Sequence, residues 1–241
     1  MDTPMPTPGG VNYYSVSLLA AEHVKVSLTG HGGDEVFAGY PAQFQVAFGS
    51  TDMFDFSGNP TRPEVTRGYR IRNLLRREGL AGVVRRLRAR MGPQSAPSPE
   101  RQWIDLHCGQ PAGVNRNIHP AFVDRLSGYS SEDDYLTSFR GAPTTEMLDR
   151  CLYHDLRCYL PSLLHMEDRV SMAASLESRV PLLDYRLAEL LATVPPEQKV
   201  LDLVPKGLLR DAGRRWLPPE ILERRDKAGF GIPDTPLTEV E

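Results

Sequence analysis

The sequence predicts an α/β domain in which helices make up most of the chain. The apolar stretch His23–Thr29 has the alternation typical of a β-strand. It runs directly into the glycine-rich segment Gly30–Glu35, and an apolar helical pattern follows. A strand, a tight loop and a helix in this order form the basic unit of α/β proteins, so this segment anchors the prediction.

Length and composition set wide limits. The chain has 241 residues, of which 40% are hydrophobic and 24% charged, which suffices for one large domain or two small ones. A formal net charge of -3 gives no global attraction to nucleic acid or to an anionic membrane, and no apolar stretch has the length of a membrane-spanning helix. Because Met1–Pro4 lacks the basic start and apolar core of a signal peptide, we expect a cytoplasmic protein.

Several further helices are expected after the first unit. The stretch Val11–Ala20 alternates only loosely, whereas Ser131 begins a helix with carboxylates in its first turn. Pro161 is expected to stop one helix before another begins. The other expected helices run from Thr144 or Thr145 to Tyr159, from Leu163 to Ala174, from Asp184 to just before Pro195, from Lys206 to Arg214 and from Pro218 to Arg225.

The three cysteines suggest no chemistry. Cys108, Cys151 and Cys158 are an odd number at spacings that match neither a zinc site nor a redox pair. Cys151 and Cys158 stand seven residues apart on an expected helix, so we expect both on one face as buried thiols.

The segment from Arg62 to Arg90 is helical in pattern and strongly basic, and the Pro- and Ser-rich stretch Gly92–Pro99 after it predicts a linker. A basic helical module for RNA, anionic lipid or a protein partner is one interpretation. A solvated helix face is the other, because Tyr69 is the only aromatic residue among these arginines.

The glycine-rich loop itself predicts a phosphate or metal site. Glycines between a strand and a helix let backbone N–H groups approach a phosphate closely, and Asp34 supplies a hard oxygen ligand suited to Mg²⁺. A turn that needs glycine only for its own geometry is the competing explanation.

A second cluster, Met166–Asp184, combines charged residues with apolar neighbours that predict burial. Buried charges are costly unless they are paired. Asp168, Arg169, Glu177 and Arg179 should therefore either pair with one another or serve a site.

Four motifs in this order resemble the C-terminal synthetase domain of the glutamine-hydrolysing asparagine synthetases. They are Leu28–Tyr40, Asp168–Asp184 without Ala174, Lys206–Arg210 and Arg225–Pro233. The resemblance extends from about Val24 to Pro233, and the stretch from Gly49 to Pro143 matches only loosely.

The resemblance implies a Rossmann-like, adenine-nucleotide alpha-hydrolase-like synthetase domain over residues 1–241. ATP and Mg²⁺ would activate the side-chain carboxylate of aspartate as an adenylate, and ammonia would then form the amide. By position, the implied site residues are Thr29, Gly30, Gly32, Gly33 and Lys206 for the nucleotide, Asp34 for the metal, and His31, Glu177 and Lys227 for catalysis.

The sequence departs from the family pattern in three ways. The Ser-Gly-Gly-x-Asp-Ser loop and the glutaminase domain are absent, and His31 replaces an acidic residue. We expect a synthetase domain cut at both ends and inactive alone, with ammonia from a glutaminase domain on a full-length protein or another chain. His31 either retunes the acceptor, marks a lost activity or has no chemical duty.

Two alternatives to asparagine synthesis remain open. A related amide-forming ligase, such as a β-lactam synthetase or a peptide macrocyclase, would share the adenylation step but use another carboxylate substrate or acceptor. An inactive fragment is the second alternative.

Overall fold

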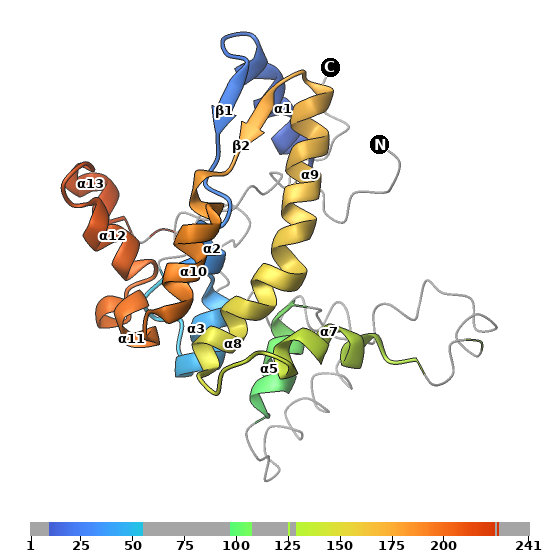
Figure 1. Ribbon diagram of the computed structural model, residues 1–241, viewed down its shortest axis with the longest axis vertical. Coiled ribbons are helices and arrows are strands. Elements are labelled where there is room, and N and C mark those ends of the chain that lie inside the picture. The colour runs from blue at the N-terminus through green and yellow to red at the C-terminus, as the bar shows by residue number, and fades with distance from the viewer. Residues whose placement is uncertain (1–9, 55–96, 108–124, 126–128, 225, 227–241) are drawn as a thin grey trace, which may run out of the picture.

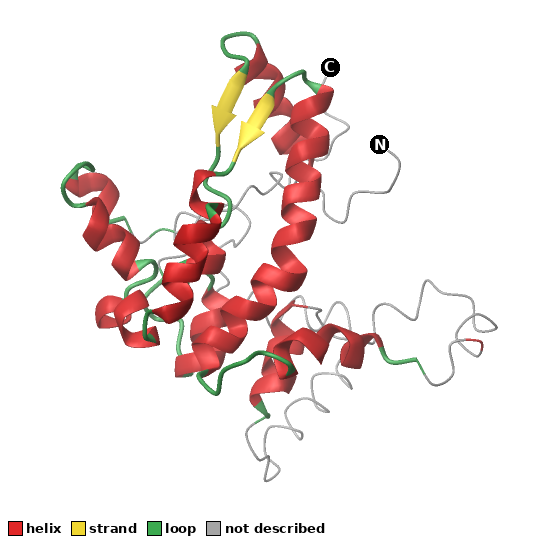
Figure 2. Ribbon diagram, in the orientation of Figure 1, coloured by secondary structure: helices red, strands yellow, loops and turns green. Residues whose placement is uncertain are grey.

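The computed structural model describes residues 10–54, 97–107, 125, 129–224 and 226. Over these residues the chain is mostly helical with a small parallel sheet, as Figures 1 and 2 show. The first helices are α1 (Gly10–Ala21), α2 (Gly33–Val36), α3 (Pro41–Phe48), α5 (Pro99–His107) and α7 (Ser131–Arg140). The later ones are α8 (Met147–His154), α9 (Leu160–Ala173), α10 (Tyr185–Thr193), α11 (Pro196–Lys199), α12 (Gly207–Gly213) and α13 (Pro219–Leu222). The strands are β1 (Val26–Leu28) and β2 (Glu177–Arg179), and the short segments are the π-helix η2 (Asp155–Tyr159) and the 3₁₀ turns η3 (Pro181–Leu183) and η4 (Leu201–Leu203).

The sheet pairs β1 with β2 in parallel, with Ser27 opposite Ser178. The predicted strand before the glycine loop is therefore confirmed, although regular pairing covers only three of its residues. Beyond the paired residues, the Thr29 N–H donates to the Arg179 carbonyl over 2.8 Å. The two strands lie beside α1 and α9 at the top of Figure 1, and the loop leaves their carboxyl end.

The loosely alternating stretch Val11–Ala20 forms helix α1 and not a strand. Only Gly10 and Ser17 of this helix are buried, so its sequence carries little amphipathic signal. Packing against α9 supplies the partner that the local pattern does not reveal.

The prediction that Pro161 ends a helix is wrong. Helix α8 continues through η2 into α9, and Pro161 lies in the first turn of α9. The Leu160 N–H bonds to the Asp155 carbonyl five residues earlier, and this wider turn accommodates a proline that lacks an N–H. The same turn changes which residues face inward, so Cys151 is buried as predicted while Cys158 is exposed.

Other helix ends follow the sequence. The Ser130 hydroxyl accepts the Asp133 N–H over 3.1 Å at the start of α7, and Asp184 accepts the Arg186 N–H over 3.0 Å at the start of α10. Helix α13 ends at Leu222, three residues before the predicted end. The basic segment, the linker up to Ala96, Cys108 and the C-terminal motif from Lys227 onward lie outside the described residues.

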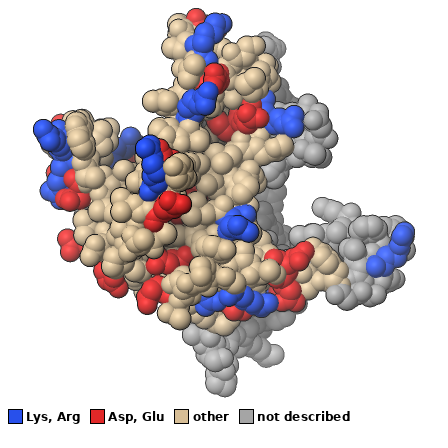
Figure 3. Space-filling model, viewed as in Figure 1, with Lys and Arg blue, Asp and Glu red and all other residues tan. Residues whose placement is uncertain are grey.

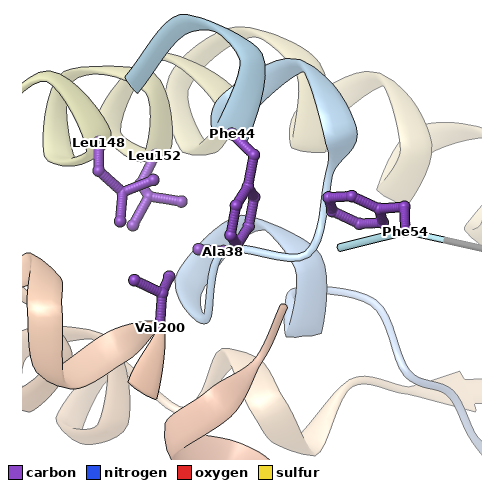
Figure 4. Close-up of a cluster of buried hydrophobic side chains, with 6 residues drawn as sticks. All are labelled: Ala38, Phe44, Phe54, Leu148, Leu152 and Val200. Carbon is purple, nitrogen blue, oxygen red and sulfur yellow. The ribbon is translucent and has the colours of Figure 1, made fainter. Parts of the chain in front are cut away.

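A hydrophobic cluster supports the segment that follows the glycine loop. Figure 4 shows its members, which come from α3 and the segments on either side of it, from α8 and from the end of α11: Ala38, Phe44, Phe54, Leu148, Leu152 and Val200. The rings of Phe44 and Phe54 meet edge to face with centroids 5.2 Å apart. Burial of these side chains holds the segment between α2 and α3 in place.

The helix that follows the glycine loop is a single turn. Helix α2 ends at Val36, Ala38 adopts a left-handed conformation with φ 58°, and Pro41 opens the separate helix α3. A single turn has little helix dipole, so any anion at this loop depends on side chains and on individual backbone groups.

The described surface carries both charge signs. On the face in Figure 3, Lys and Arg side chains alternate with Asp and Glu from top to bottom. Among the described residues, no helix is both long and apolar enough to cross a membrane.

Candidate functional site

A cavity of about 510 Å³ opens beside the glycine loop. Five of the predicted site residues line it: Thr29, Gly30, His31, Asp34 and Lys206. The lining residues that had not been predicted include two tyrosines and two glutamates: Tyr13, Tyr40, Glu35 and Glu167. The cavity therefore combines α1, the carboxyl end of β1, α2, α9 and the residue that precedes α12.

Asp34 and Lys206 meet in this cavity although 171 positions separate them in the sequence. Lys206 Nζ lies 3.1 Å from Asp34 Oδ1, and both side chains are partly exposed. The Lys206 N–H also donates to the Ala38 carbonyl over 3.0 Å. Lys206 and Ala38 both have φ 58°, a conformation that costs most residues about 1–3 kcal/mol and that surrounding contacts must maintain.

The Asp34 carboxylate lies directly against Gly39. A Cβ atom on Gly39 would come 1.9 Å from Asp34 Oδ1 and 2.5 Å from Lys206 Cε, so a larger residue there would displace both side chains. The Gly39 N–H donates to the Asp34 carbonyl over 2.9 Å. Backbone and side chain of Asp34 are thus both packed against the same glycine.

The three loop glycines differ in their surroundings. An added Cβ on Gly30 would meet nothing within 4 Å, and this glycine borders the cavity. Gly32 has φ 90°, and a Cβ there would come 2.3 Å from Leu183, while a Cβ on Gly33 would come 3.1 Å from Leu182. Turn geometry and packing account for Gly32 and Gly33, whereas Gly30 leaves room for a bound group.

His31 is held by two contacts. Its Nδ1 lies 3.0 Å from Thr29 Oγ1, and its ring stacks on Tyr13 with centroids 5.8 Å apart and an interplanar angle of 28°. The imidazole therefore lies on the wall shared by the loop and α1.

Glu35 and Glu167 are buried carboxylates that line the cavity. Glu35 accepts a 2.6 Å hydrogen bond from the Tyr40 hydroxyl, and Glu167 accepts one of 2.8 Å from Ser178. Burial first, and then the charge of Glu35, raises the pKa of the Tyr40 hydroxyl, which keeps it a donor. Glu35 stands within the motif Leu28–Tyr40, whereas Glu167 directly precedes the motif that begins at Asp168.

For Glu167 a signal was available in the sequence. It is four residues after Leu163 and three before Val170, which is the spacing of one helical face. The sequence analysis instead singled out Asp168 and Arg169, which are exposed. For Glu35 no local pattern distinguishes a cavity wall from an ordinary first-turn acid.

The charges of the cavity bear on the ligand it can hold. Of the described residues that line it, Asp34, Glu35 and Glu167 are acidic and Lys206 is the one Lys or Arg. A polyphosphate would meet repulsion here unless a cation offset it. Carboxylate oxygens are ligands that Mg²⁺ accepts together with phosphates and water, so Asp34 fits the predicted metal role.

One predicted catalytic residue, Glu177, is not brought into the cavity. Glu177 forms an ion pair with Arg179 on the exposed side of β2 and is not among the lining residues. The burial predicted for these charges is wrong, because Glu177 and Arg179 are exposed, and they pair with each other at the surface. Lys227 lies outside the described residues.

Comparison with known proteins gives the family. The sequence profile of the asparagine synthase family matches residues 1–238, so the chain belongs to that family. The chain is 26% identical over 239 residues to glutamine-hydrolysing asparagine synthetase 1 of Bacillus subtilis, covering 96% of this chain and 34% of that protein.

Two further relatives differ in extent. Glutamine-hydrolysing asparagine synthetase 3 of B. subtilis is 44% identical over 73 residues, which are 30% of this chain and 12% of that protein. Amidase chry2 of Gibberella zeae is 23% identical over 248 residues, covering 95% of this chain and 36% of that protein. The chain spans about a third of the length of the first relatives, and no solved structure matches it.

Proposed function

We propose that residues 1–241 form part of an asparagine synthase-type synthetase domain of the adenine-nucleotide alpha-hydrolase-like, Rossmann-like kind. The residues that line the cavity beside the glycine loop would form one side of the adenylation site of this domain. The observation that carries this proposal is the Asp34–Lys206 pair at the carboxyl end of a parallel strand, in a chain whose family is shown. Ligands of open α/β sheets bind at this end of the strands.

The residues have distinct roles toward ATP. The open space at Gly30 and the adjoining Thr29 would receive the nucleotide, and Lys206 would contact a phosphate oxygen. Asp34 would hold Mg²⁺, which spreads the negative charge that builds as pyrophosphate leaves. Lys206 pairs with Asp34 when no ligand is bound. When a phosphate and a cation bind together, the phosphate could pair with Lys206 and the cation with Asp34, so neither charge would be left unpaired.

The acceptor chemistry is assigned by position. Glu177 would assist proton removal from the amine as the amide forms, and Lys227 would stabilise the charged transition state. Since Glu177 pairs with Arg179 outside the cavity, this role requires the Glu177 side chain to turn toward the acyl centre. His31 would contact the acyl-acceptor side, and its bonds to Thr29 and Tyr13 set its orientation.

The proposed reaction is the conversion of aspartate to asparagine. ATP activates the side-chain carboxylate, pyrophosphate leaves, and ammonia attacks the adenylate to give the amide and AMP. The ammonia would come from a glutaminase domain on the same protein or on another chain. Family membership supports this reaction over a β-lactam synthetase or a macrocyclase, because the relatives named above include two asparagine synthetases.

Binding of Mn²⁺ and ATP to the purified chain tests the site directly. Electron paramagnetic resonance counts free Mn²⁺ during a titration with ATP present. We expect Asp34→Asn to weaken Mn²⁺ retention about tenfold or more, because one hard oxygen charge is lost. Asp105→Asn is the matched control, since the exposed Asp105 side chain pairs with Arg101 within α5. If wild type and Asp34→Asn retain Mn²⁺ equally well, Asp34 is not a metal ligand.

The reaction is tested with the longest in-frame product of the gene. Formation of AMP is measured with ATP, Mg²⁺, ammonia and aspartate, and again without aspartate. Aspartate-dependent AMP is the expected result. If AMP formation does not depend on aspartate but depends on another carboxylate, the protein catalyses a related amide ligation and not asparagine synthesis.

A further inference from the structure

A buried side chain links the loop that carries Asp34 to the long helix behind it. Gln43, in α3, is fully buried, and its Nε2 donates to Asp155 Oδ2 over 2.7 Å and to the Asp34 carbonyl over 3.2 Å. Its Oε1 accepts the Tyr40 N–H over 2.9 Å. One amide group therefore bonds to both ends of the segment 34–40 and anchors it to Asp155.

Asp155 has an unusual setting for a carboxyl group. It is fully buried at the first position of η2, where the helix widens into a π turn. Its Oδ1 is the one buried side-chain nitrogen or oxygen of the described residues that has no hydrogen-bond partner, with His107 Nε2 3.7 Å away. Burial of such a group costs free energy, and π turns are frequent near functional sites.

The carbonyl of Asp34 is the point where these contacts converge. It accepts both the Gly39 N–H over 2.9 Å and the Gln43 amide, and the carboxylate of the same residue packs against Gly39. Because the carbonyl and the carboxylate belong to one residue, holding the first restricts the position of the second. A shift of about 1 Å at such a ligand is enough to weaken a site markedly.

We propose that Gln43 and Asp155 are positioning residues that hold Asp34 at the place where it binds the metal–nucleotide complex. Asp155 orients the amide of Gln43, and the amide holds the Asp34 carbonyl. The role at the metal rests on the function proposed above, whereas the restraint on the loop does not. Neither residue touches the cavity, since neither is among its lining residues.

The linkage needs an acceptor at residue 155 and not a negative charge. Burial raises the pKa of Asp155 to about 8, opposed by the hydrogen bond from Gln43, so the neutral acid prevails at pH 7. Asparagine has the same shape and retains an acceptor oxygen for Gln43, whereas leucine has none. Asp155→Asn should therefore preserve the linkage that Asp155→Leu removes.

Hydrogen exchange at the Gly39 amide measures the linkage without any ligand. We expect Gln43→Met and Asp155→Leu in the 241-residue chain to speed this exchange about tenfold beyond the change in global stability. In Asp155→Asn, the Gly39 amide should exchange at the wild-type rate. Leu136→Ala is the control, because it empties a buried position in the cluster that α7 shares with α3, α5 and α8 and leaves the hydrogen bonds of Gln43 and Asp155 in place. Gln43→Asn, one methylene too short to reach both acceptors, replaces Gln43→Met if that variant does not fold.

The same variants then enter the Mn²⁺ titration with ATP. We expect Mn²⁺ retention to be about tenfold weaker in Asp155→Leu than in wild type. It should be restored in Asp155→Asn and unchanged in Leu136→Ala. Unchanged Gly39 exchange in the Gln43 and Asp155→Leu variants overturns the inference. Failure of wild type to bind Mn²⁺ and ATP refutes the proposed function and the metal role, while the exchange data still decide whether the linkage restrains the loop.

Discussion

Lys206 contacts the segment that carries Asp34 through both its side chain and its backbone. Lys206 Nζ lies 3.1 Å from Asp34 Oδ1, and the Lys206 N–H bonds to the Ala38 carbonyl over 3.0 Å. A left-handed lysine at the end of a proline-containing turn is an unfavourable conformation, and these two bonds maintain it. Side-chain and backbone roles can therefore be separated by substitution.

Lys206→Gly and Lys206→Ala should differ in stability. Both remove the ion pair, but only glycine adopts φ 58° without steric cost, so we expect Lys206→Gly to be more stable by about 1 kcal/mol. Urea unfolding of the two variants measures the difference. Mn²⁺ retention with ATP should weaken equally in both, and a weaker effect in either one would mean that the ammonium group is not the phosphate contact.

Gly39→Ala should disrupt the site more than Gly30→Ala. At Gly39 the new methyl group would overlap the Asp34 carboxylate, so we expect a loss of about 1–3 kcal/mol together with loss of Mn²⁺ binding. At Gly30 the methyl group meets no protein atom, so stability should stay within about 0.5 kcal/mol while nucleotide binding weakens. Thermal unfolding and ATP titration of both variants check this contrast, and normal nucleotide binding by Gly30→Ala would place the nucleotide elsewhere.

Stability should fall as the pH rises from 6.5 to 8.5, because of Asp155. Its pKa of about 8 in the folded chain is above the usual carboxyl value, so in this window the folded state retains a proton that the unfolded state has released. The free energy of unfolding therefore decreases with pH, by at most about 1.4 kcal/mol per pH unit. Burial lowers the pKa values of His107 and His154 in the folded chain, so near pH 6.5 the unfolded state binds protons at these residues that the folded state does not. This opposes the effect of Asp155 at the lower end of the window and fades above about pH 7.5.

Asp155→Asn should remove this slope. It replaces the neutral acid with a group that does not titrate, so the variant should gain about 1–2 kcal/mol over wild type between pH 6.5 and 8.5. Urea unfolding at several pH values measures the difference. Parallel curves for the two proteins would show that Asp155 is ionised or solvated in the folded chain.

Glu177→Gln separates chemistry from stability. The Glu177–Arg179 ion pair lies on the exposed side of β2, and such pairs contribute at most about 1 kcal/mol. We expect the unfolding temperature to stay nearly unchanged, while aspartate-dependent amide formation by the longest in-frame product decreases strongly. Retention of full amide formation would exclude Glu177 as the proton acceptor.

Some features followed from local sequence because their causes are local. The strand before the glycine loop, the hydroxyl cap at Ser130 and the carboxylate cap at Asp184 all depend on residues within a few positions. The grouping of Thr29, Gly30, His31 and Asp34 likewise lies in one loop. Lys206 was assigned through the family pattern, and its place beside Asp34 agrees with that assignment.

The tertiary structure decided what depends on contacts between distant segments. It made the Val11–Ala20 stretch a helix against α9, carried the long helix past Pro161 through a π turn, and turned Glu177 toward Arg179. It also placed Asp155 behind Asp34 through Gln43, a linkage 112 positions long that no local pattern encodes. Local sequence was enough to predict the loop after the strand, because backbone geometry and residue type are local, and the chemistry of the loop stays a prediction. Which charges meet across that loop depended on packing, because burial brings together residues that the chain keeps far apart.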